Sequence, residues 1–303
     1  MSETRPAVNP HFDQDRIVWS DDYSGQYDPV PYAQQFDDQW RLFLERKLGF
    51  CDHTGVETTD DYIDDRIYEL TGVANFLASH RGVVTDSGKD RDIGGRLHLE
   101  PKFPLDFFQG KRCLDLGCGA GRWTRTLQAL GGLVKSTDVS AHGLESTRRF
   151  NDDVEVLNLF DVLPKRPDLH GAFDVTICWG VIMCTHDPRL AFANAAATVR
   201  PGGHLYVMVY APTYHASPFV TENRKKYHAA EMTFEEKMDF AYGLSEDPRN
   251  AINLLDMLNT FYNWTITEDT VVKWYIDHGF SEVTVLNRHE PHNCGWHVLG
   301  RKA

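Results

Sequence analysis

The feature that most constrains the fold is an alternation of short apolar runs with helical stretches between Lys111 and Tyr210. Such an alternation is typical of parallel strands joined by crossover helices. It predicts a doubly wound α/β fold with helices on both faces of a sheet. Strands are expected at Arg112–Leu116, Leu133–Asp138, Val154–Asn158, Phe173–Cys178 and His204–Tyr210, and helices at Gly121–Ala129, Leu144–Phe150 and Arg189–Val199.

An insertion interrupts this pattern at about residues 211–263, with helices expected at Thr221–Tyr242 and Asn250–Leu258. It leaves the sheet where ligands bind in α/β folds, so it is a candidate substrate cover. The pattern then resumes and closes the chain. We expect a helix over Thr267–His278 and strands at Ser281–Leu286 and Trp296–Gly300.

The sequence divides into an N-terminal cap over residues 1–110 and a core over residues 111–303 that contains the insertion. In the cap, Trp40, Phe43 and Leu44 fall at helical spacing, which predicts an amphipathic helix. A second helix is expected from Asp60 to Leu70.

Composition narrows the class of protein. The chain has 303 residues and a formal net charge of −13, which disfavours nucleic acid as a partner. Its N-terminus has no secretory signal pattern, and no apolar run has the length of a membrane span. The six cysteines show no paired C-x-x-C spacing. We therefore expect a cytoplasmic protein without membrane association.

A glycine loop follows the first expected strand, where Gly117, Gly119 and Gly121 alternate and a helix then begins. Such glycines let a ligand approach the main chain, and the helix start offers free N–H groups. A dinucleotide fingerprint would require glycine at position 122, which is Arg122. Asp115 would repel a pyrophosphate and suits a ligand with an amine.

At this point the chain resembles the class I S-adenosylmethionine (SAM)-dependent methyltransferases of small-molecule type. Their D-x-G-x-G-x-G motif matches Asp115 to Gly121, with Cys118 inside it. The resemblance implies a mostly parallel seven-stranded sheet with an antiparallel last strand, SAM as cofactor and S-adenosylhomocysteine as product. It implies that Asp138, followed by Val139, binds the ribose hydroxyls and that Asp161 binds the adenine amino group.

The same resemblance assigns further cofactor contacts. Phe160 and Val162 would flank the adenine ring, and Trp179 and Gly180 would lie under the methionine part of SAM. The short segment around Trp40 resembles an arm that folds over the cofactor in some small-molecule methyltransferases, although a helix that only packs on the core fits equally well.

The acceptor side is less determined by the sequence. His186 and His215 are candidate proton acceptors because they follow the fourth and fifth strands, where the acceptor is expected. Each also fits an ordinary loop histidine. Residues that could line the acceptor pocket are Met183, Tyr210, Tyr214 and Tyr262.

A bound metal is not expected. The close spacing of His289, His292 and Cys294 has no partner cluster of the kind that structural metal sites require.

We expect methyl transfer to oxygen, nitrogen or sulfur of a small molecule by in-line displacement, in a monomer or homodimer. The segment Cys178–Val181 lacks the N/D-P-P-Y/F pattern of base methyltransferases. An RNA or protein methyltransferase, or a non-catalytic protein that keeps the fold, remains as an alternative.

Overall fold

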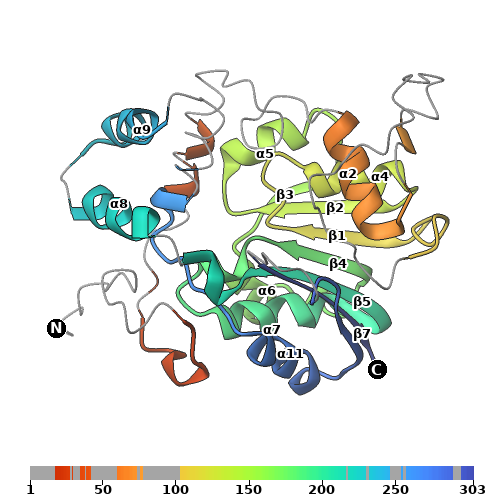
Figure 1. Ribbon diagram of the computed structural model, residues 1–303. Coiled ribbons are helices and arrows are strands. Elements are labelled where there is room, and N and C mark those ends of the chain that lie inside the picture. Colours follow the sequence, from red (N-terminus) through yellow and green to blue (C-terminus); the bar gives the residue numbers. More distant parts are fainter. Residues whose placement is uncertain are drawn as a thin grey trace.

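The computed structural model describes residues 18–27, 29, 35–37, 39–41, 60–73, 76–77, 103–215, 218–229, 232–245, 254, 257–288 and 295–303. A sheet fills the middle of the molecule, with helices above and below it (Figure 1). Residues 289–294, which contain the candidate metal ligands, and most of the expected helix beyond Trp40 lie outside the described part.

The sheet confirms the predicted fold class. It has seven strands in the order β3-β2-β1-β4-β5-β7-β6. Only β7 runs antiparallel to its neighbours β5 and β6; the other described pairings are parallel. The strands are β1 Arg112–Leu116, β2 Leu133–Asp138, β3 Val154–Val156, β4 Phe173–Trp179, β5 Val199–Tyr210, β6 Phe280–Val285 and β7 Gly295–Lys302.

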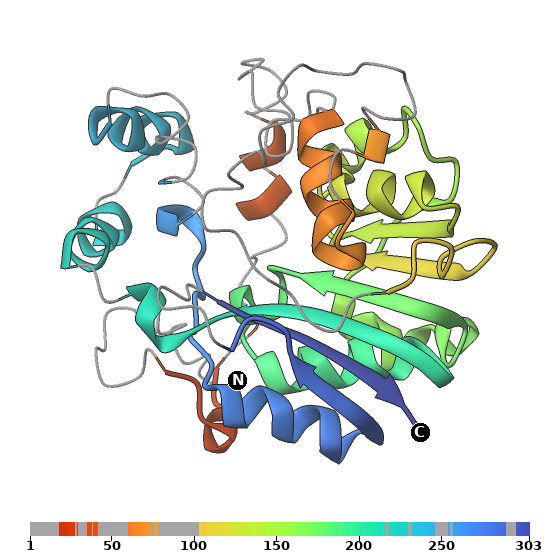
Figure 2. The same cartoon turned by 45° about the vertical axis from the view of Figure 1, so that its right-hand side comes forward.

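Helices cover both faces of the sheet (Figures 1 and 2). One face carries α2 Asp60–Thr71, α4 Arg122–Ala129 and α5 Ala141–Thr147. The opposite face carries α6 Val162–Lys165, α7 Pro188–Thr198 and α11 Glu268–Asp277. The insertion helices α8 Pro218–Ala229 and α9 Phe234–Gly243 lie beyond the end of the sheet, away from both layers.

Several predicted boundaries are wrong for local reasons. β3 ends two residues early because the side chain of Asn158 accepts a hydrogen bond from Phe160 N and starts a 3-10 turn. β5 begins at Val199 and not at the expected His204, so the segment Pro201-Gly202-Gly203 belongs to the strand. α5 begins at Ala141, because Ser140 caps it by accepting from Gly143 N at 2.9 Å.

The helix expected over Thr221–Tyr242 is two helices. Thr233 caps the second of them through a capping box: its hydroxyl accepts from Glu236 N, and the Glu236 carboxylate accepts from Thr233 N. This reciprocal pair satisfies two main-chain donors that a helix start leaves open. A capping signal inside a helix-forming stretch is therefore the feature that marks the break.

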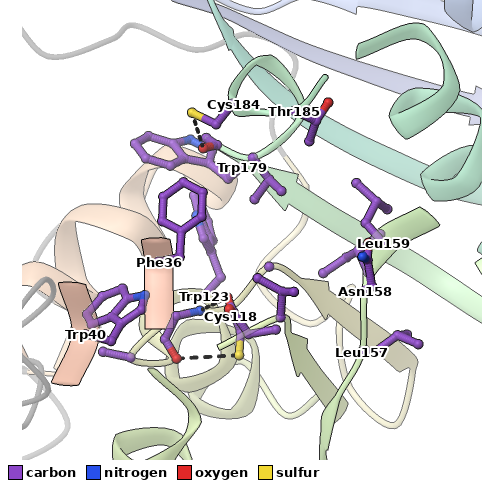
Figure 3. A pocket seen from close by; sticks show the side chains of 18 of the residues that line it. Phe36, Trp40, Cys118, Trp123, Leu157, Asn158, Leu159, Trp179, Cys184 and Thr185 are labelled. Atoms are coloured by element: carbon purple, nitrogen blue, oxygen red, sulfur yellow. Dashed lines mark hydrogen bonds between the residues drawn. The ribbon is translucent and has the colours of Figure 1, made fainter. Parts of the chain in front are cut away.

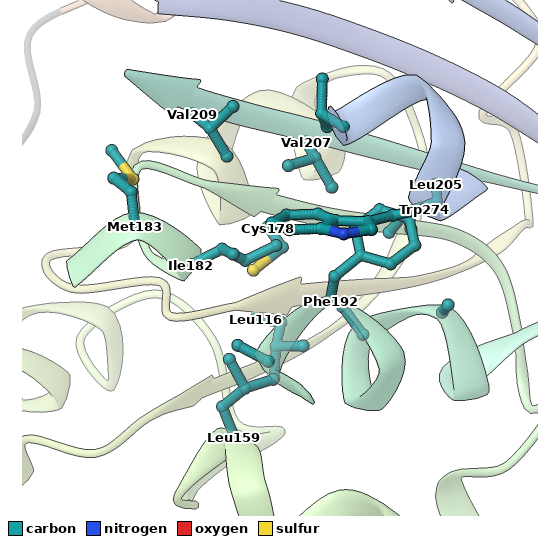
Figure 4. Close-up of a cluster of buried hydrophobic side chains, with 14 of the residues drawn as sticks. Leu116, Leu159, Cys178, Ile182, Met183, Phe192, Leu205, Val207, Val209 and Trp274 are labelled. Carbon is teal, nitrogen blue, oxygen red and sulfur yellow. The ribbon is translucent and has the colours of Figure 1, made fainter. Parts of the chain in front are cut away.

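The main hydrophobic cluster lies between β4, β5 and the helices α7 and α11 (Figure 4). Phe192 of α7 packs against Trp274 and Tyr275 of α11, with ring centroids 5.7 and 4.8 Å apart. The Tyr275 hydroxyl is fully buried and donates to the carbonyls of Leu205 and Val298. These contacts fix α11 against the central strands.

The described parts of the N-terminal region lie in three separate places. Residues 18–27 pack beside α11, where Trp19 N donates to Thr265 O at 2.8 Å. Helical residues 35–41, described except for residue 38 and here called the arm helix, lie between the insertion and α5 (Figure 2). α2 packs against α4 and the sheet. Among the described helices, none is long and apolar enough to cross a membrane.

Candidate cofactor and acceptor site

A cavity lies where β1, β2 and β4 end, at the point where the strand order reverses. Ligands of α/β sheets bind at such a switch point. The cavity encloses about 1040 Å³, part of it open to solvent. Figure 3 shows Phe36 and Trp40 of the arm helix on the side of Trp123 and Trp179, with Leu157, Asn158 and Leu159 opposite. It is lined by Phe36, Gln39, Trp40, Leu116, Gly117, Cys118, Gly119, Ala120, Arg122, Trp123, Asp138, Val139, Leu157, Asn158, Leu159, Trp179, Gly180, Val181, Cys184 and Thr185.

The glycine loop forms the floor of this cavity. Gly119 has a φ of +51°, and a Cβ placed there would come within 2.7 Å of the Trp40 ring. A Cβ on Gly117 would approach a methyl group of Val181 to 2.4 Å. The main chain of the loop is therefore in direct contact with the arm helix and with the segment after β4, which only glycine permits.

Asp138, the last residue of β2, holds the loop in place. Its carboxylate accepts from Gly119 N and from Ser140 N, each at 2.8 Å. Burial raises the pKa of this carboxyl, against the effect of the main-chain hydrogen bonds. Asp138 also lines the cavity, so one side chain both fixes the glycine loop and offers an acidic group to a ligand.

Asp115 lies behind the loop and outside the cavity lining. Its carboxylate accepts from the Thr124 hydroxyl at 2.7 Å, and that hydroxyl is 2.7 Å from Ser136 Oγ. Burial raises the pKa of Asp115 to about 7, although the hydrogen bonds from Thr124 and the charge of Arg122 act in the opposite direction. Asp115 can therefore change its charge near neutral pH, close to the loop.

The arm helix is anchored at both sides of the cavity. The Asp37 carboxylate accepts from Ser140 Oγ at 2.8 Å and from His142 N at 3.1 Å, and it pairs with His142 Nδ1 at 2.8 Å. On the insertion side, Asn259 Nδ2 donates to Gln39 Oε1 at 2.7 Å. These bonds place Phe36 and Trp40 over the glycine loop.

The comparison with known protein families decides the class. The family model described as a methyltransferase domain matches residues 94–265, which is more than half of the chain. The chain belongs to this methyltransferase family. SAM is the cofactor that family membership implies.

Curated relatives of this methyltransferase include ubiquinone biosynthesis O-methyltransferases. The one from Cronobacter sakazakii is 31% identical over 100 residues, which are 32% of this chain and 41% of the relative. The mitochondrial one from Schizosaccharomyces pombe is 29% identical over 144 residues, or 41% of this chain and 51% of the relative. The chain thus spans about two fifths to one half of the length of these relatives.

Solved structures of similar proteins have lower identity. A Burkholderia thailandensis 1,6-didemethyltoxoflavin-N1-methyltransferase, bound to 1,6-didemethyltoxoflavin and S-adenosylhomocysteine, is 13% identical with a TM-score of 0.42, covering 88% of this chain and 90% of that one. A SAM-dependent methyltransferase from Thermotoga maritima, described as a possible histamine N-methyltransferase, is 17% identical with a TM-score of 0.42, covering 64% and 83%.

In this methyltransferase, eight of the residues predicted to bind the cofactor line the cavity: Trp40, Gly117, Cys118, Gly119, Asp138, Val139, Trp179 and Gly180. Gly121 instead faces α5, since a Cβ there would meet Phe150 and Thr147 at 2.6 Å. Asp161 pairs with Lys165 at 2.9 Å, and neither it nor its neighbours Phe160 and Val162 are among the lining residues.

The residues predicted for the acceptor side are more scattered. Met183 and Tyr262 have no exposed surface and belong to the main hydrophobic cluster, as Figure 4 shows for Met183. Tyr210 packs against the same cluster. The His186 ring lies against Phe160, 4.4 Å between centroids, and His186 is not among the cavity-lining residues. The side chains of Tyr214 and His215 lie outside the described part.

Sequence reasoning missed several lining residues that had a visible signal. Asn158 ends the third expected strand, where a polar side chain at a carboxyl end points to a ligand. Arg122 and Trp123 open the helix that follows the glycine loop. Gln39 precedes Trp40 in the segment that resembles a cofactor-covering arm, whereas Phe36 had no such signal, because it reaches the cavity only through the fold of the arm helix. In the described residues, no group of three or more His, Cys, Asp or Glu side chains could hold a metal ion.

The cavity fits SAM in the chemistry of its wall. Gly117 and Gly119 bring main chain without a Cβ to the cavity wall, packed closely against Val181 and Trp40. Asp138 supplies a carboxylate for hydroxyl groups or cationic groups, and Trp179 and Leu159 supply apolar surface. An aromatic ring near a cation is favourable, which suits the sulfonium of SAM.

Proposed function

We propose that this protein transfers the methyl group of SAM to a small, flat acceptor in the cavity under the arm helix. The observation that supports this most is the meeting, in one cavity, of the glycine loop, Asp138 and four aromatic rings. The family to which the chain belongs points to the same reaction class. A cytoplasmic location agrees with this proposal.

We propose cofactor roles for the residues along the cavity. Gly117 and Gly119 would contact the methionine part of SAM with their main chain, and Asp138 would accept hydrogen bonds from the ribose. Because Leu157, Asn158 and Leu159 line the cavity beside Asp138, they are better placed than Asp161 to hold the adenine. Phe160 and Val162 would then support this wall from behind.

SAM supplies an activated methyl group on a positively charged sulfur. Attack by the acceptor disperses that charge, so the protein has mainly to align the two reactants and exclude water. The rings of Phe36, Trp40 and Trp179 form an apolar wall that helps to exclude water from the reactants. Thr185 is the hydroxyl among the lining residues, and its Oγ1 donates to Ile182 O at 2.7 Å, which leaves its oxygen lone pairs as an acceptor.

For the acceptor we propose an aromatic molecule with a hydroxyl group. Flat aromatic rings stack well on Phe36 and Trp40. The curated relatives are named as O-methyltransferases of ubiquinone biosynthesis, which agrees with an oxygen nucleophile. His186 and His215 stay predictions as proton acceptors, and His186 would need the segment after β4 to move before it reached the cavity.

The test of this function is in two steps. Calorimetric titration of the full chain with SAM should show binding, and binding of S-adenosylhomocysteine should compete with it. A panel of phenols, aromatic amines and thiols is then screened for release of S-adenosylhomocysteine, with phenols expected to give turnover. A chain that binds neither ligand would instead be a non-catalytic protein of this fold.

Ionisation of Asp115 is expected to make SAM binding depend on pH. Because its pKa is about 7, the carboxylate forms as pH rises through neutrality, and a nearby negative charge favours the cationic cofactor. The dissociation constant for SAM should fall severalfold between about pH 6 and about pH 8. Asp115→Asn should abolish this dependence; a variant with the wild-type pH profile would contradict the role of Asp115.

In the absence of ligand, the raised pKa of Asp115 makes the fold less stable as pH rises, whereas SAM affinity is expected to increase. A carboxyl whose folded pKa lies above its usual value stabilises the fold at low pH and loses that contribution as pH rises through the folded pKa. Asp115→Asn should therefore be more stable than wild type at about pH 8, by roughly 2 to 4 kcal/mol, with the gain vanishing near pH 4. Thermal denaturation at both pH values measures it.

Release of Asp37 is expected to loosen the arm helix. Asp37→Ala removes the hydrogen bonds to Ser140 and His142, so SAM should dissociate about three to ten times faster, a change of roughly 1 kcal/mol. Stopped-flow chase of bound SAM with excess S-adenosylhomocysteine measures this rate. Asp152→Ala, an exposed acid beyond the far end of α5, is the control with the same loss of charge. Equal rates in both variants would contradict a role for the anchor.

A further inference from the structure

A buried polar cluster lies where α2 packs against the sheet, outside the cavity lining. Its members are Arg66 and Glu69 of α2, Tyr206 of β5 and His297 of β7, which are between 1% and 7% exposed. They sit among apolar neighbours such as Ile63 and Leu127. Charged groups are rarely buried without paired partners, so such a cluster requires an explanation.

Polar atoms of the four side chains lie close to one another. Arg66 pairs with Glu69 at 2.6 Å. The Tyr206 hydroxyl donates to the other oxygen of the Glu69 carboxylate. His297 Nδ1 lies 2.7 Å from that hydroxyl and 3.2 Å from the carboxylate. Because the hydroxyl proton already goes to Glu69, the imidazole donates from Nδ1 to both oxygens.

The cluster holds an ion pair rather than a neutral network. Burial disfavours the charge of Glu69, but Arg66 and the hydrogen bonds from His297 and Tyr206 outweigh it and lower the pKa of Glu69 to about 2. The Arg66 guanidinium therefore stays opposite a full negative charge at neutral pH. At the cavity, the negative charge of Glu69 therefore largely cancels the positive charge of Arg66.

The other side of the guanidinium faces the cavity wall. Arg66 Cζ is 5.6 Å from the ring centroids of both Trp123 and Trp179. Both indoles line the cavity, and His297 packs edge-on against Trp179 with centroids 6.0 Å apart. Trp179, Tyr206 and His297 lie on one face of three neighbouring strands, as the pairing register requires. The cluster thus supports the Trp179 indole from behind the wall, while Arg122 of the lining lies over the same ring, with its Cζ 4.5 Å from the centroid.

We propose that Arg66 and Glu69 are positioning residues for the cofactor site: Arg66 fixes the Trp179 indole, and Glu69 cancels a positive charge that would oppose a cationic ligand. This inference rests on the proposed function, since it takes SAM as the ligand beside Trp179. It gives α2, which contributes nothing to the cavity lining, a defined part in cofactor recognition.

Two ligands of different charge can distinguish the proposed role of Arg66 and Glu69 from a purely structural role of α2. SAM carries a sulfonium, whereas S-adenosylhomocysteine has a neutral thioether and the same shape otherwise. Glu69→Gln would leave Arg66 uncompensated behind the wall of the cavity. A positive charge in a poorly screened interior acts over several ångströms. It should weaken SAM binding more than S-adenosylhomocysteine binding, which a general loosening of α2 would not do.

The experiment is calorimetric titration of the full chain and its variants with each ligand. Glu69→Gln is expected to weaken SAM binding by about tenfold. The loss of affinity for S-adenosylhomocysteine should be smaller than the loss for SAM by a factor of at least about three. The double variant Arg66→Met with Glu69→Gln removes both charges and should weaken both ligands equally, by about fivefold, because Trp179 loses its support. Arg66→Lys keeps a cation and should lie closer to wild type.

Leu70→Ala is the matched control, because Leu70 is a buried apolar residue of α2 in the hydrophobic cluster around the polar one, and its loss removes no charge. It should lower the melting temperature while leaving the affinity ratio of the two ligands unchanged. The inference is overturned if the double variant binds SAM like wild type, or if Leu70→Ala shifts the ratio as Glu69→Gln does.

Failure of the proposed function gives a different result, since the wild-type chain itself would then bind neither ligand. Should Glu69→Gln not fold, the double variant, which buries no isolated charge, still decides: wild-type affinity contradicts the positioning role, and a weakening of both ligands that Leu70→Ala does not cause supports it. Tryptophan emission of the double variant, compared with that of Trp179→Phe, reports directly whether the indole has moved.

Discussion

Replacing Asp138 by alanine is expected to weaken SAM binding by more than about tenfold, or roughly 1.4 kcal/mol. The loss has two parts, because the carboxylate fixes Gly119 N and Ser140 N and also lines the cavity. Without it, Gly119 of the glycine loop and Ser140 at the start of α5 each lose a charge-assisted hydrogen bond, which is stronger than a neutral one. Titration calorimetry at constant pH measures the affinity.

Asp153→Ala is the control for this change. Asp153 is an acid whose side chain is 62% exposed and pairs with Lys135 at 2.9 Å, at the opposite end of β2. The variant loses the same charge far from the cavity, so it should bind SAM like wild type. Equal affinities of Asp138→Ala and wild type would remove Asp138 from the cofactor site.

Gly119→Ala is expected to reduce SAM affinity at least as strongly. The φ of +51° is unfavourable for alanine by about 1 to 2 kcal/mol. In addition, the new methyl group would lie 2.7 Å from the Trp40 ring, so the arm helix must move away from the loop. We expect a loss of more than about tenfold in affinity together with a lower melting temperature.

Gly110→Ala separates backbone strain from contact with the arm. Gly110 has a φ of +67°, yet nothing lies within 4 Å of the position a Cβ would take. It should therefore cost similar stability and leave SAM affinity unchanged. If both variants lost affinity alike, the contact between Gly119 and Trp40 would have no bearing on the cofactor site.

The central strands could be predicted from the sequence because the residues that start and end them are close together in the chain. β1 and β2 have the predicted bounds, since each is a short apolar run that ends at a glycine loop or an aspartate. The family resemblance supplied the antiparallel last strand. The insertion was harder, because Thr233 begins a new helix within a stretch whose composition favours a helix throughout. Here the capping box outweighs periodicity.

The residues that line the cavity could be predicted from the sequence only in part, because some of them come from segments far apart in the chain. Gly117, Gly119, Asp138 and Trp179 were predicted, and they follow strands whose carboxyl ends meet at one edge of the sheet. Phe36 and Gln39 come from far along the chain, and only the hydrogen bond of Gln39 to Asn259 and the anchor of Asp37 bring them there. Such long-range packing leaves no periodic trace.

The segment at residues 18–27 has a consequence for how the chain is made. Trp19 bonds to Thr265, and Asp21 accepts from Trp274 Nε1 at 2.8 Å, across 253 positions in the sequence. The first described segment to leave the ribosome can therefore form these two contacts only after nearly the whole chain has emerged. Contacts of such sequence separation form late and slow the overall reaction. This segment, although made early, is therefore expected to dock late, after α11 and the residues before it have been synthesised.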